Sequence, residues 1–252
     1  MIEFPGRRVL VTGASKGIGE ACARLFARLG AEVAVHYGRD EAAARAVVSA
    51  IEADGGKARA FGAELGAWDA GERLVHEVEG AIGALDVVVL NHGIYELRAI
   101  DAMRARDYDA TFDSNVRGYF SVASAAAKRM KPRGRGRIIF VSSTAGQRGE
   151  AQAAHYAASK GAAISMTKSL AVELAPFWIL VNCVAPGWVA TPMSKATLDD
   201  PALRAKVLAT IPIGRVATPE EIAAPIAFLA SEEASFVTGE IFNVNGGAVL
   251  VG

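Results

Sequence analysis

Short runs of apolar and β-branched residues alternate with longer alanine-rich stretches along this chain. A run of about four to eight such residues between turn formers predicts a β-strand, because it fits a buried, pleated surface. The strand candidates are Arg8–Thr12, Glu32–Tyr37, Lys57–Phe61, Leu85–Leu90, Gly136–Ser142, Ile179–Ala185 and Glu240–Val244. The longer stretches predict helices near residues 17–29, 40–53, 68–82, 107–130, 155–175 and 218–230.

This alternation predicts the fold class. Strands that alternate with helices form right-handed βαβ units, which assemble into a parallel sheet covered on both faces. The apolar runs Val87–Leu90 and Ile138–Val141 are typical of central strands that are buried on both sides. We therefore expect an α/β fold with a single doubly wound parallel sheet of the Rossmann type, forming one domain over residues 1–252.

One long irregular stretch, at about residues 186–218, interrupts the alternation and holds four prolines. An irregular segment of this length inside a compact domain is more often a functional lid than a spacer. We expect a substrate-loop insertion here, with short helices in its middle.

Composition narrows the classes of protein to which the chain can belong. It has 252 residues, 52% of them hydrophobic, with 27 basic and 27 acidic side chains. A net charge of zero argues against nucleic-acid binding, which needs a basic excess. Cys22 and Cys183 fall in predicted element interiors and offer no disulfide framework or metal spacing. With no leader sequence and no apolar run near the roughly 20 residues that span a bilayer, we expect a soluble cytoplasmic protein without a membrane partner.

A glycine-rich turn follows the first predicted strand and leads directly into a helix. The turn reads Thr12-Gly13-Ala14-Ser15-Lys16-Gly17-Ile18-Gly19. Glycines at such a turn let the backbone approach a pyrophosphate, which rests on the positive N-terminus of the helix. Because a strand precedes the turn and a helix follows it, the sequence predicts a dinucleotide cofactor.

The end of the second predicted strand indicates which dinucleotide binds. An acidic residue there would bind the ribose of NAD, whereas a basic residue would receive the 2′-phosphate of NADP. Tyr37 stands where the acid is expected, Arg39 follows, and Lys16 can reach the same phosphate. Asp40 could compete as a ribose ligand, but its place before an alanine-rich helix favours an N-cap. NADP(H) is therefore favoured, and NAD(H) remains possible.

Tyr156 and Lys160 lie four positions apart in a predicted helix, and Ser143 lies at the end of the predicted strand Gly136–Ser142, thirteen positions before Tyr156. Residues four apart share one helix face. An ammonium near a phenol favours the phenolate, which a tyrosine needs for proton transfer near neutral pH. A solvated pair would have the same spacing, so the interpretation depends on the rest of the chain.

In combination, these motifs make the chain resemble the single-domain short-chain dehydrogenases/reductases along nearly its whole length. The resemblance extends to Asn91-His92-Gly93-Ile94 after the fourth strand, to Asn115 in a helix, to Ser142-Ser143, and to Pro186-Gly187 with Thr191. It implies an oxidoreductase that transfers a hydride between NADP(H) and a carbonyl or secondary alcohol.

The resemblance also implies residue roles. Tyr156 would be the general acid in reduction and the base in oxidation, and Ser143 would hold the substrate oxygen. Lys160 would lower the pKa of Tyr156 and bind the nicotinamide ribose, while Asn115 would keep a water that links Lys160 to solvent. No metal is expected. The expected cofactor contacts are Gly13, Ser15, Lys16, Gly17, Ile18, Gly19, Tyr37, Arg39, Glu64, Leu65, Asn91, Gly93, Tyr156, Lys160, Pro186, Gly187, Val189 and Thr191.

Two residues depart from the family pattern. Glu64 stands where relatives commonly have an aspartate beside the adenine, so its contact is shifted by one methylene. His92 replaces a small residue beside the cofactor, and it either packs without titrating or takes part in catalysis.

The substrate is not evident from the sequence. The expected pocket consists of Ala145, Gly146, Gln147, Glu150, Gln152, Trp188 and Met193, with Tyr95 and Glu96 at its rim. The chain is similar both to 3-oxoacyl-carrier-protein reductases and to sugar and polyol dehydrogenases. A carrier-protein reductase should present basic groups to its acidic partner. The segment Pro176–Leu180 has none, whereas Arg133 and Arg135 remain candidates.

Other interpretations stay open. Phe177 and Trp178 either pack a helix end on the next strand or form a subunit or acyl-binding surface. Small residues in Ala123–Met130 and in 157–166 allow close helix approach, so we expect a homotetramer, with a dimer as the alternative. Two alternative functions are a non-catalytic dinucleotide-sensing regulator and an isomerase or dehydratase on the same fold.

Overall fold

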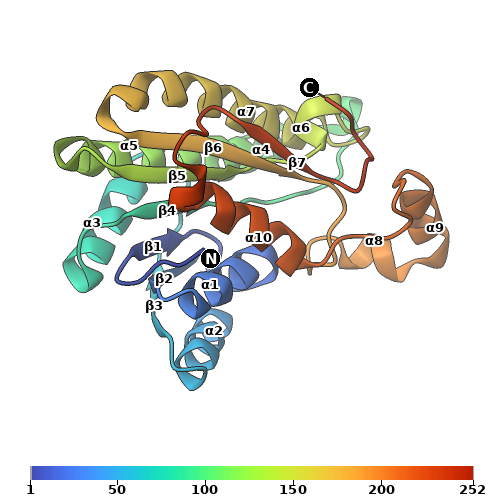
Figure 1. Ribbon diagram of the computed structural model, residues 1–252. Coiled ribbons are helices and arrows are strands. Elements are labelled where there is room, and N and C mark those ends of the chain that lie inside the picture. Colours follow the sequence, from blue (N-terminus) through green and yellow to red (C-terminus); the bar gives the residue numbers. More distant parts are fainter. Residues whose placement is uncertain (1, 252) are drawn as a thin grey trace.

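Seven parallel strands form one sheet at the centre of the computed structural model, which describes residues 2–251 (Figure 1). The strand order is β3-β2-β1-β4-β5-β6-β7, so the chain reverses direction across the sheet between β1 and β4. The strands are β1 (Arg8–Val11), β2 (Glu32–Tyr37), β3 (Lys57–Gly62), β4 (Val87–Leu90), β5 (Gly136–Val141), β6 (Ile179–Pro186) and β7 (Ile241–Val244). The predicted doubly wound sheet is confirmed, and each strand lies within two residues of its expected bounds.

Helices cover both faces of the sheet. The longer ones are α1 (Gly17–Arg28), α2 (Glu41–Ala53), α3 (Ala70–Ile82), α5 (Gly118–Met130), α7 (Ala154–Leu174) and α10 (Pro219–Ala230). In one core, α1, α2 and α10 pack on the sheet, and in the other α3, α5 and α7 do so. Alternation along β1 explains the two cores, because Val9 and Val11 enter the first and Leu10 the second. All four residues of β4 and all eight of β6 are buried, as expected of central strands.

The helix predicted near residues 107–130 is interrupted. It consists of α4 (Ala105–Phe112), a π-helical segment (Asp113–Arg117) and α5. The pattern of apolar residues does not reveal the change from α-helix to π-helix, because the three segments follow one another without a break. A π-helical turn inside a helix is frequently found at a functional site.

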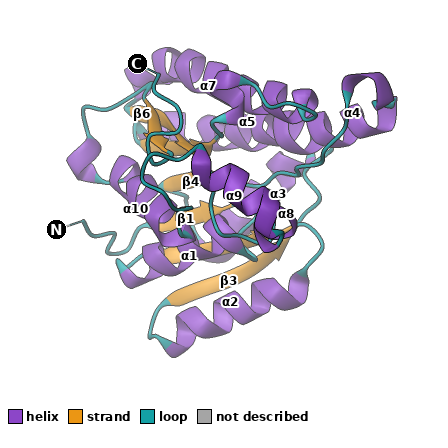
Figure 2. Cartoon of the chain, turned by 90° about the vertical axis from the view of Figure 1, so that its right-hand side faces the viewer, coloured by secondary structure: helices purple, strands orange, loops and turns teal. Residues whose placement is uncertain are grey.

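Short helices lie at the carboxyl ends of the strands. The stretch at residues 186–218 contains α8 (Lys195–Asp199) and α9 (Pro201–Ala209), which project from the body beyond the sheet (Figures 1 and 2). The expectation of short helices there is confirmed. A further helix that was not expected, α6 (Ala145–Arg148), directly follows β5 and is too short to give a periodic signal. Among residues 2–251 no helix has the length and apolar character that crossing a membrane requires.

Candidate active site

The carboxyl ends of β1, β4, β5 and β6 surround one pocket. It is lined by Ile18, Asn91, Gly93, Tyr95, Val141, Ser142, Ser143, Thr144, Ala145, Arg148, Glu150, Tyr156, Lys160, Pro186, Gly187, Trp188, Val189, Thr191, Met193 and Ser194. In a parallel sheet the strands that flank the point of reversal leave a crevice at this edge. The predicted pocket residues Tyr95, Ala145, Glu150, Trp188 and Met193 are confirmed as lining.

Four other residues expected in the pocket do not line it, namely Gly146, Gln147, Gln152 and Glu96. The Gln147 amide turns to the last strand, where its Nε2 donates to Asn243 Oδ1 at 2.6 Å. Gly146 packs against the backbone of α7, since a Cβ there would lie 2.6 Å from the Lys160 carbonyl carbon. Arg148 of the unexpected helix α6 lines the pocket instead, and its Nη2 lies 3.4 Å from Glu150 Oε2.

The glycine turn between β1 and α1 packs closely on its own backbone and on neighbouring loops. Gly13 has a φ of 63°, which favours glycine. A Cβ on Gly19 would lie 2.2 Å from the Gly13 carbonyl oxygen. Asn91 fixes the turn, because its Nδ2 donates to the carbonyl oxygens of Thr12 and Gly13 at 3.1 Å each. These contacts fix the backbone of the turn at the start of α1, where the pyrophosphate of a dinucleotide was expected.

His36 also holds the glycine turn and was not among the predicted site residues. Its Nδ1 accepts a hydrogen bond from the Gly13 amide at 3.0 Å, so the proton is on Nε2, which lies 2.9 Å from the Ala63 carbonyl oxygen. The imidazole is almost fully buried, and burial lowers the pKa of His36 to about 4. The only signal in the sequence was a histidine near the end of an otherwise apolar strand.

The expected 2′-phosphate site contains an unexpected ion pair. Arg39 Nε donates to Glu64 Oε1 at 2.8 Å, and both side chains are mostly exposed. The hydrogen bond to Arg39 and its charge lower the pKa of Glu64. Glu64, expected to contact adenine, is therefore bound to the guanidinium that was expected to receive the phosphate.

The other residues considered for the ribose and adenine end of the cofactor lie in four different settings. Lys16 is exposed at the start of α1, within the glycine turn. Tyr37 packs over Gly62 on the next strand, where a Cβ would lie 2.8 Å from its hydroxyl. Asp40 is the N-cap of α2 and accepts from the Ala43 amide at 3.1 Å, as expected. The side chain of Leu65 is buried in the core.

The loop after β6 approaches the glycine turn. A Cβ on Gly17 would lie 3.3 Å from Thr191 Cγ2. Ser194, which was not predicted as a site residue, shapes this loop, because its Oγ donates to the Val189 carbonyl at 2.5 Å and accepts from the Thr191 amide at 3.1 Å. The predicted residues Pro186, Gly187, Val189 and Thr191 all line the pocket here.

Tyr156 lies at the wall of the pocket beside Ser143. Its ring stands edge-on to that of Tyr95, with centroids 4.8 Å apart. Burial raises the pKa of Tyr156 to about 12, although a hydrogen bond with Ser143 acts in the opposite direction. Ser143 is itself fixed, since its Oγ accepts from the Ala145 amide at 3.1 Å. The phenol is therefore protonated at neutral pH in this structure.

Lys160 does not contact Tyr156 in the way that the sequence suggested. Its Nζ donates to the Val141 carbonyl at 2.9 Å and to the Tyr119 hydroxyl at 3.2 Å, and it lies 5.9 Å from the Tyr156 ring centroid. Burial lowers the pKa of Lys160 to about 8. Lys160 is not among the groups that shift the pKa of Tyr156 in this arrangement, because the ammonium is turned towards β5 and α5, and the expected lowering of that pKa stays a prediction.

Asn115 occupies the π-helical segment before α5 and joins three elements. Its Oδ1 accepts from the Ile94 amide at 2.9 Å, and its Nδ2 donates to the Ile94 carbonyl at 3.0 Å and to Ser159 Oγ at 3.1 Å. Both amide protons of the side chain are thus used. The expected water could therefore bind this amide only as a donor to Oδ1, which has one lone pair left.

Comparisons with known proteins identify the family. Residues 13–249 match the family model described as enoyl-(acyl carrier protein) reductase. The chain is 42% identical to the L-rhamnose 1-dehydrogenase (NAD(P)(+)) of Azotobacter vinelandii over 96% of both chains. It is similar to a solved short chain dehydrogenase from Burkholderia cenocepacia in complex with NADP, with 36% identity, a TM-score of 0.91, and coverage of 97% of this chain and 98% of that one. The chain belongs to the short-chain dehydrogenase/reductase family.

Two further relatives illustrate the range of this family. The 3-oxoacyl-acyl-carrier-protein reductase of Synechocystis is 40% identical over 99% of this chain and 100% of that one. A gluconate 5-dehydrogenase from Burkholderia cenocepacia, solved with NADP and tartrate, has 32% identity and a TM-score of 0.93, with coverage of 98% of this chain and 96% of that one. The prediction of an NAD(P)-dependent oxidoreductase of this family, with NADP(H) as the favoured cofactor, is confirmed.

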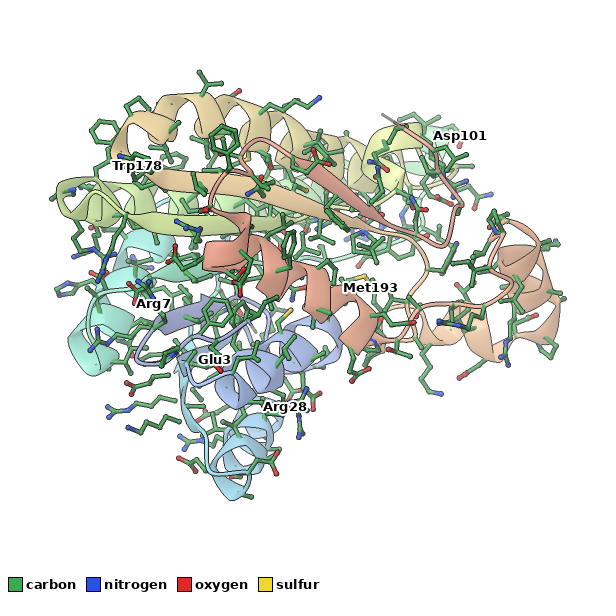
Figure 3. The ribbon with its side chains drawn as sticks, in the orientation of Figure 1. Glu3, Arg7, Arg28, Asp101, Trp178 and Met193 are labelled. Atoms are coloured by element: carbon green, nitrogen blue, oxygen red, sulfur yellow. The ribbon has the colours of Figure 1, made fainter. Side chains whose placement is uncertain are left out.

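The remaining candidates for partner contacts in this short-chain dehydrogenase lie at the amino ends of the strands, opposite to the pocket. Trp178 precedes β6 and is 71% exposed, whereas Met193 lies beyond the carboxyl end of β6, so the two lie at opposite ends of this strand (Figure 3). Arg133 and Arg135 are held at the same edge as Trp178, by the Leu85 carbonyl and by Asp86 respectively. Trp178, Arg133 and Arg135 do not line the active-site pocket.

Proposed function

We propose that this chain is an NADP(H)-dependent dehydrogenase/reductase that uses Tyr156 as its general acid and base and acts on a sugar or polyol. The observation that carries the proposal is the constellation of Ser143, Tyr156 and Lys160 beside a pocket that also contains the Arg148–Glu150 ion pair. A hydroxyl-rich substrate can donate to the Glu150 carboxylate and accept from the Arg148 guanidinium.

The proton chemistry follows from the burial of Tyr156. Because its pKa is about 12, the phenol holds a proton that it can give to the substrate oxygen during reduction. Ser143 would hold that oxygen through its hydroxyl. When bound, the reduced nicotinamide supplies the hydride that reduces the carbonyl carbon. In the oxidation direction the phenol must first lose its proton, which the positive charge of Lys160 favours when it is turned towards the ring.

The predicted cofactor contacts would hold NADP(H) along the crevice. The glycine turn from Gly13 to Gly19 would hold the pyrophosphate at the N-terminus of α1, and Arg39 with Lys16 would hold the 2′-phosphate. Thr191 and its neighbours after β6 would position the nicotinamide. Glu64 would compete with the phosphate for Arg39, which supports acceptance of NAD(H) as well.

A 3-oxoacyl-carrier-protein reductase is the second candidate, supported by the 40% identical Synechocystis relative. The site gives it less support, because Arg133, Arg135 and Trp178 lie far from the pocket mouth. A non-catalytic sensor has no need for Ser143 and Tyr156 together. An isomerase or dehydratase would use the same fold, but no observation of the pocket favours it.

We also propose a cytoplasmic homotetramer in which residues 186–218 act as the substrate loop of a single domain. The two cysteines are free and buried, which suits a reducing compartment. Phe120 on α5 and Val172 on α7 are exposed apolar residues, and a subunit contact would cover them. Light scattering coupled to size-exclusion chromatography would distinguish a tetramer from a dimer.

The decisive experiment is Tyr156→Phe, measured with a panel of sugars, polyols, ketones and acyl thioesters. Turnover should fall at least about 100-fold, because the proton donor is lost, while NADPH affinity changes little. Tyr108→Phe removes the same hydroxyl from the exposed surface of α4 and should retain full turnover. If Tyr156→Phe keeps most of the rate, the assigned chemistry is wrong. If the wild type oxidises NADPH with no member of the panel, the sensor hypothesis is favoured.

A further inference from the structure

The ammonium of Lys160 is buried among neutral groups. The residue is 4% exposed, and its electrostatic neighbours among the described residues include no carboxylate. The titratable groups that face it are Tyr119 from α5, Tyr156 from its own helix, Cys183 from β6 and His92 after β4. A buried charge without an anionic partner depends on its hydrogen-bond acceptors to remain charged.

Tyr119 supplies one of the two acceptors. Its side chain is completely buried, and its hydroxyl donates to the Val141 carbonyl at 2.9 Å while accepting from Lys160 Nζ at 3.2 Å. Val141 therefore accepts hydrogen bonds from both residues. The three groups form a closed triangle at the end of β5, two residues before Ser143. The Lys160 ammonium also lies 5.1 Å from the Tyr119 ring centroid, which adds a cation–π attraction.

The tyrosine is held firmly in this position. Tyr119 is the second residue of α5, which directly follows the π-helical segment. Its ring stands edge-on to that of His92, with centroids 4.8 Å apart. His92 is neutral, because burial holds its pKa well below the usual value, with smaller effects from His36 and Lys160. Thr12 fixes the His92 ring, with Oγ1 2.8 Å from Nδ1. His92 therefore packs without adding a second positive charge beside Lys160.

We propose that Tyr119 is a positioning residue for the reaction: its hydroxyl holds the Lys160 ammonium against the Val141 carbonyl and sets the pH range in which Lys160 stays charged. The inference rests on the role proposed above for Lys160 towards the cofactor ribose. It adds a residue outside the Ser143, Tyr156 and Lys160 set, with a function that acts through Lys160 and not through the substrate.

The charge state of Lys160 is the quantity that Tyr119 controls. Lys160 titrates near pH 8 with two acceptors in place. Tyr119→Phe would leave Val141 as the sole remaining acceptor of the pair. Losing one hydrogen bond to a charged group lowers its protonation constant by roughly tenfold, or about one pH unit. At neutral pH a large part of the variant would then carry a neutral Lys160.

Cofactor binding provides a direct test. The dissociation constants of NADH and NADPH are measured by nicotinamide fluorescence on the full chain from roughly pH 6 to pH 9.5. NADH is included because the 2′-phosphate of NADPH titrates by itself near about pH 6. The wild type should lose affinity with a midpoint near 8. In Tyr119→Phe the midpoint should be about one pH unit lower, with equal affinity at the acidic limit.

Two controls separate positioning from packing. Tyr108→Phe, on the exposed surface of α4, should keep the wild-type midpoint. The free energy of unfolding of each variant is measured alongside. If Tyr119→Phe does not fold, Cζ-labelled tyrosine in the wild type replaces it, because the Tyr119 resonance should then follow the Lys160 titration. An unchanged midpoint, a uniform loss of affinity at every pH, or a Tyr119 resonance that does not titrate overturns the proposal.

The outcome is independent of the test of the proposed function. A shifted binding midpoint together with undiminished turnover in Tyr156→Phe would retain the Tyr119 assignment and refute the proton chemistry of Tyr156. Loss of turnover in Tyr156→Phe together with an unchanged binding midpoint in Tyr119→Phe would retain the proton chemistry of Tyr156 and refute the Tyr119 assignment.

Discussion

His36 should make the stability of this enzyme depend on pH. The imidazole titrates near 6.5 in an unfolded chain and near 4 in the folded protein, where burial disfavours its charged form. Between these values the unfolded chain binds more protons, so acidification favours unfolding. The contribution of His36 is fully present above about pH 6.5 and is lost as the pH falls towards 4.

The size of the effect follows from the difference of 2.5 pKa units, 6.5 minus 4. At about 1.36 kcal/mol per unit, the folded state loses about 3 kcal/mol in total, of which about 2 kcal/mol is lost by pH 5. The loss also reaches the cofactor site, because a protonated Nδ1 can no longer accept from the Gly13 amide. Cofactor affinity should therefore decline over the same pH range.

His36→Gln is the appropriate perturbation. A glutamine can accept from Gly13 and donate to Ala63 but does not titrate, and His92, which titrates in the same direction, is retained in both proteins. Urea unfolding of the cofactor-free proteins, at one protein concentration between roughly pH 4.5 and pH 8, gives both stability curves. Between pH 8 and pH 5 the wild type should lose about 2 kcal/mol more of its free energy of unfolding than His36→Gln loses. Parallel curves, or a His36 NMR titration near 6.5, would refute the reasoning.

Two other predictions concern the cofactor phosphate and the packing of α3. Arg39→Ala should weaken NADPH binding about tenfold and leave NADH binding unchanged. Glu64→Gln should strengthen NADPH binding about threefold, because it releases the Arg39 guanidinium. Isothermal titration with both cofactors checks this, and equal changes in the affinities for NADPH and NADH would contradict it. Gly71→Ala should lower the free energy of unfolding by about 2 kcal/mol, because its Cβ would lie 2.3 Å from Ser121 Oγ. Gly80→Ala in the same helix has open space around its Cβ and should stabilise by up to about 1 kcal/mol in the same urea experiment.

The fold could be predicted from the sequence because its signals are local. Continuous apolar runs such as Val87–Leu90 indicate central strands, and Asp40 before a helix indicates an N-cap. The glycine turn was also recognisable, since a strand precedes it and a helix follows. Each of these signals depends on a few neighbouring residues whose chemistry has one common structural outcome.

The contacts of individual site residues could not be predicted in the same way. A spacing of four places Tyr156 and Lys160 on one face, but it does not reveal that the ammonium turns to acceptors on β5 and α5. Arg39 and Glu64 are 25 positions apart and meet only because β2 and β3 are adjacent. Arg148 was missed because it lies in a four-residue helix, and His36 because its partners come from two different loops.

The π-helical segment Asp113–Arg117 has a consequence for insertions and deletions. A π-helical turn closes its hydrogen bonds between residues i and i+5, so it holds one residue more than the α-helical turn that it replaces. Deleting one residue from this segment would therefore leave a regular α-helix and keep Tyr119 in the core, whereas adding one residue would rotate everything after it by about 100°. Asn115 must be spared, because its side chain joins this segment to Ile94 and Ser159. In a library of length changes, this segment should accept a single-residue deletion that spares Asn115 more readily than an insertion.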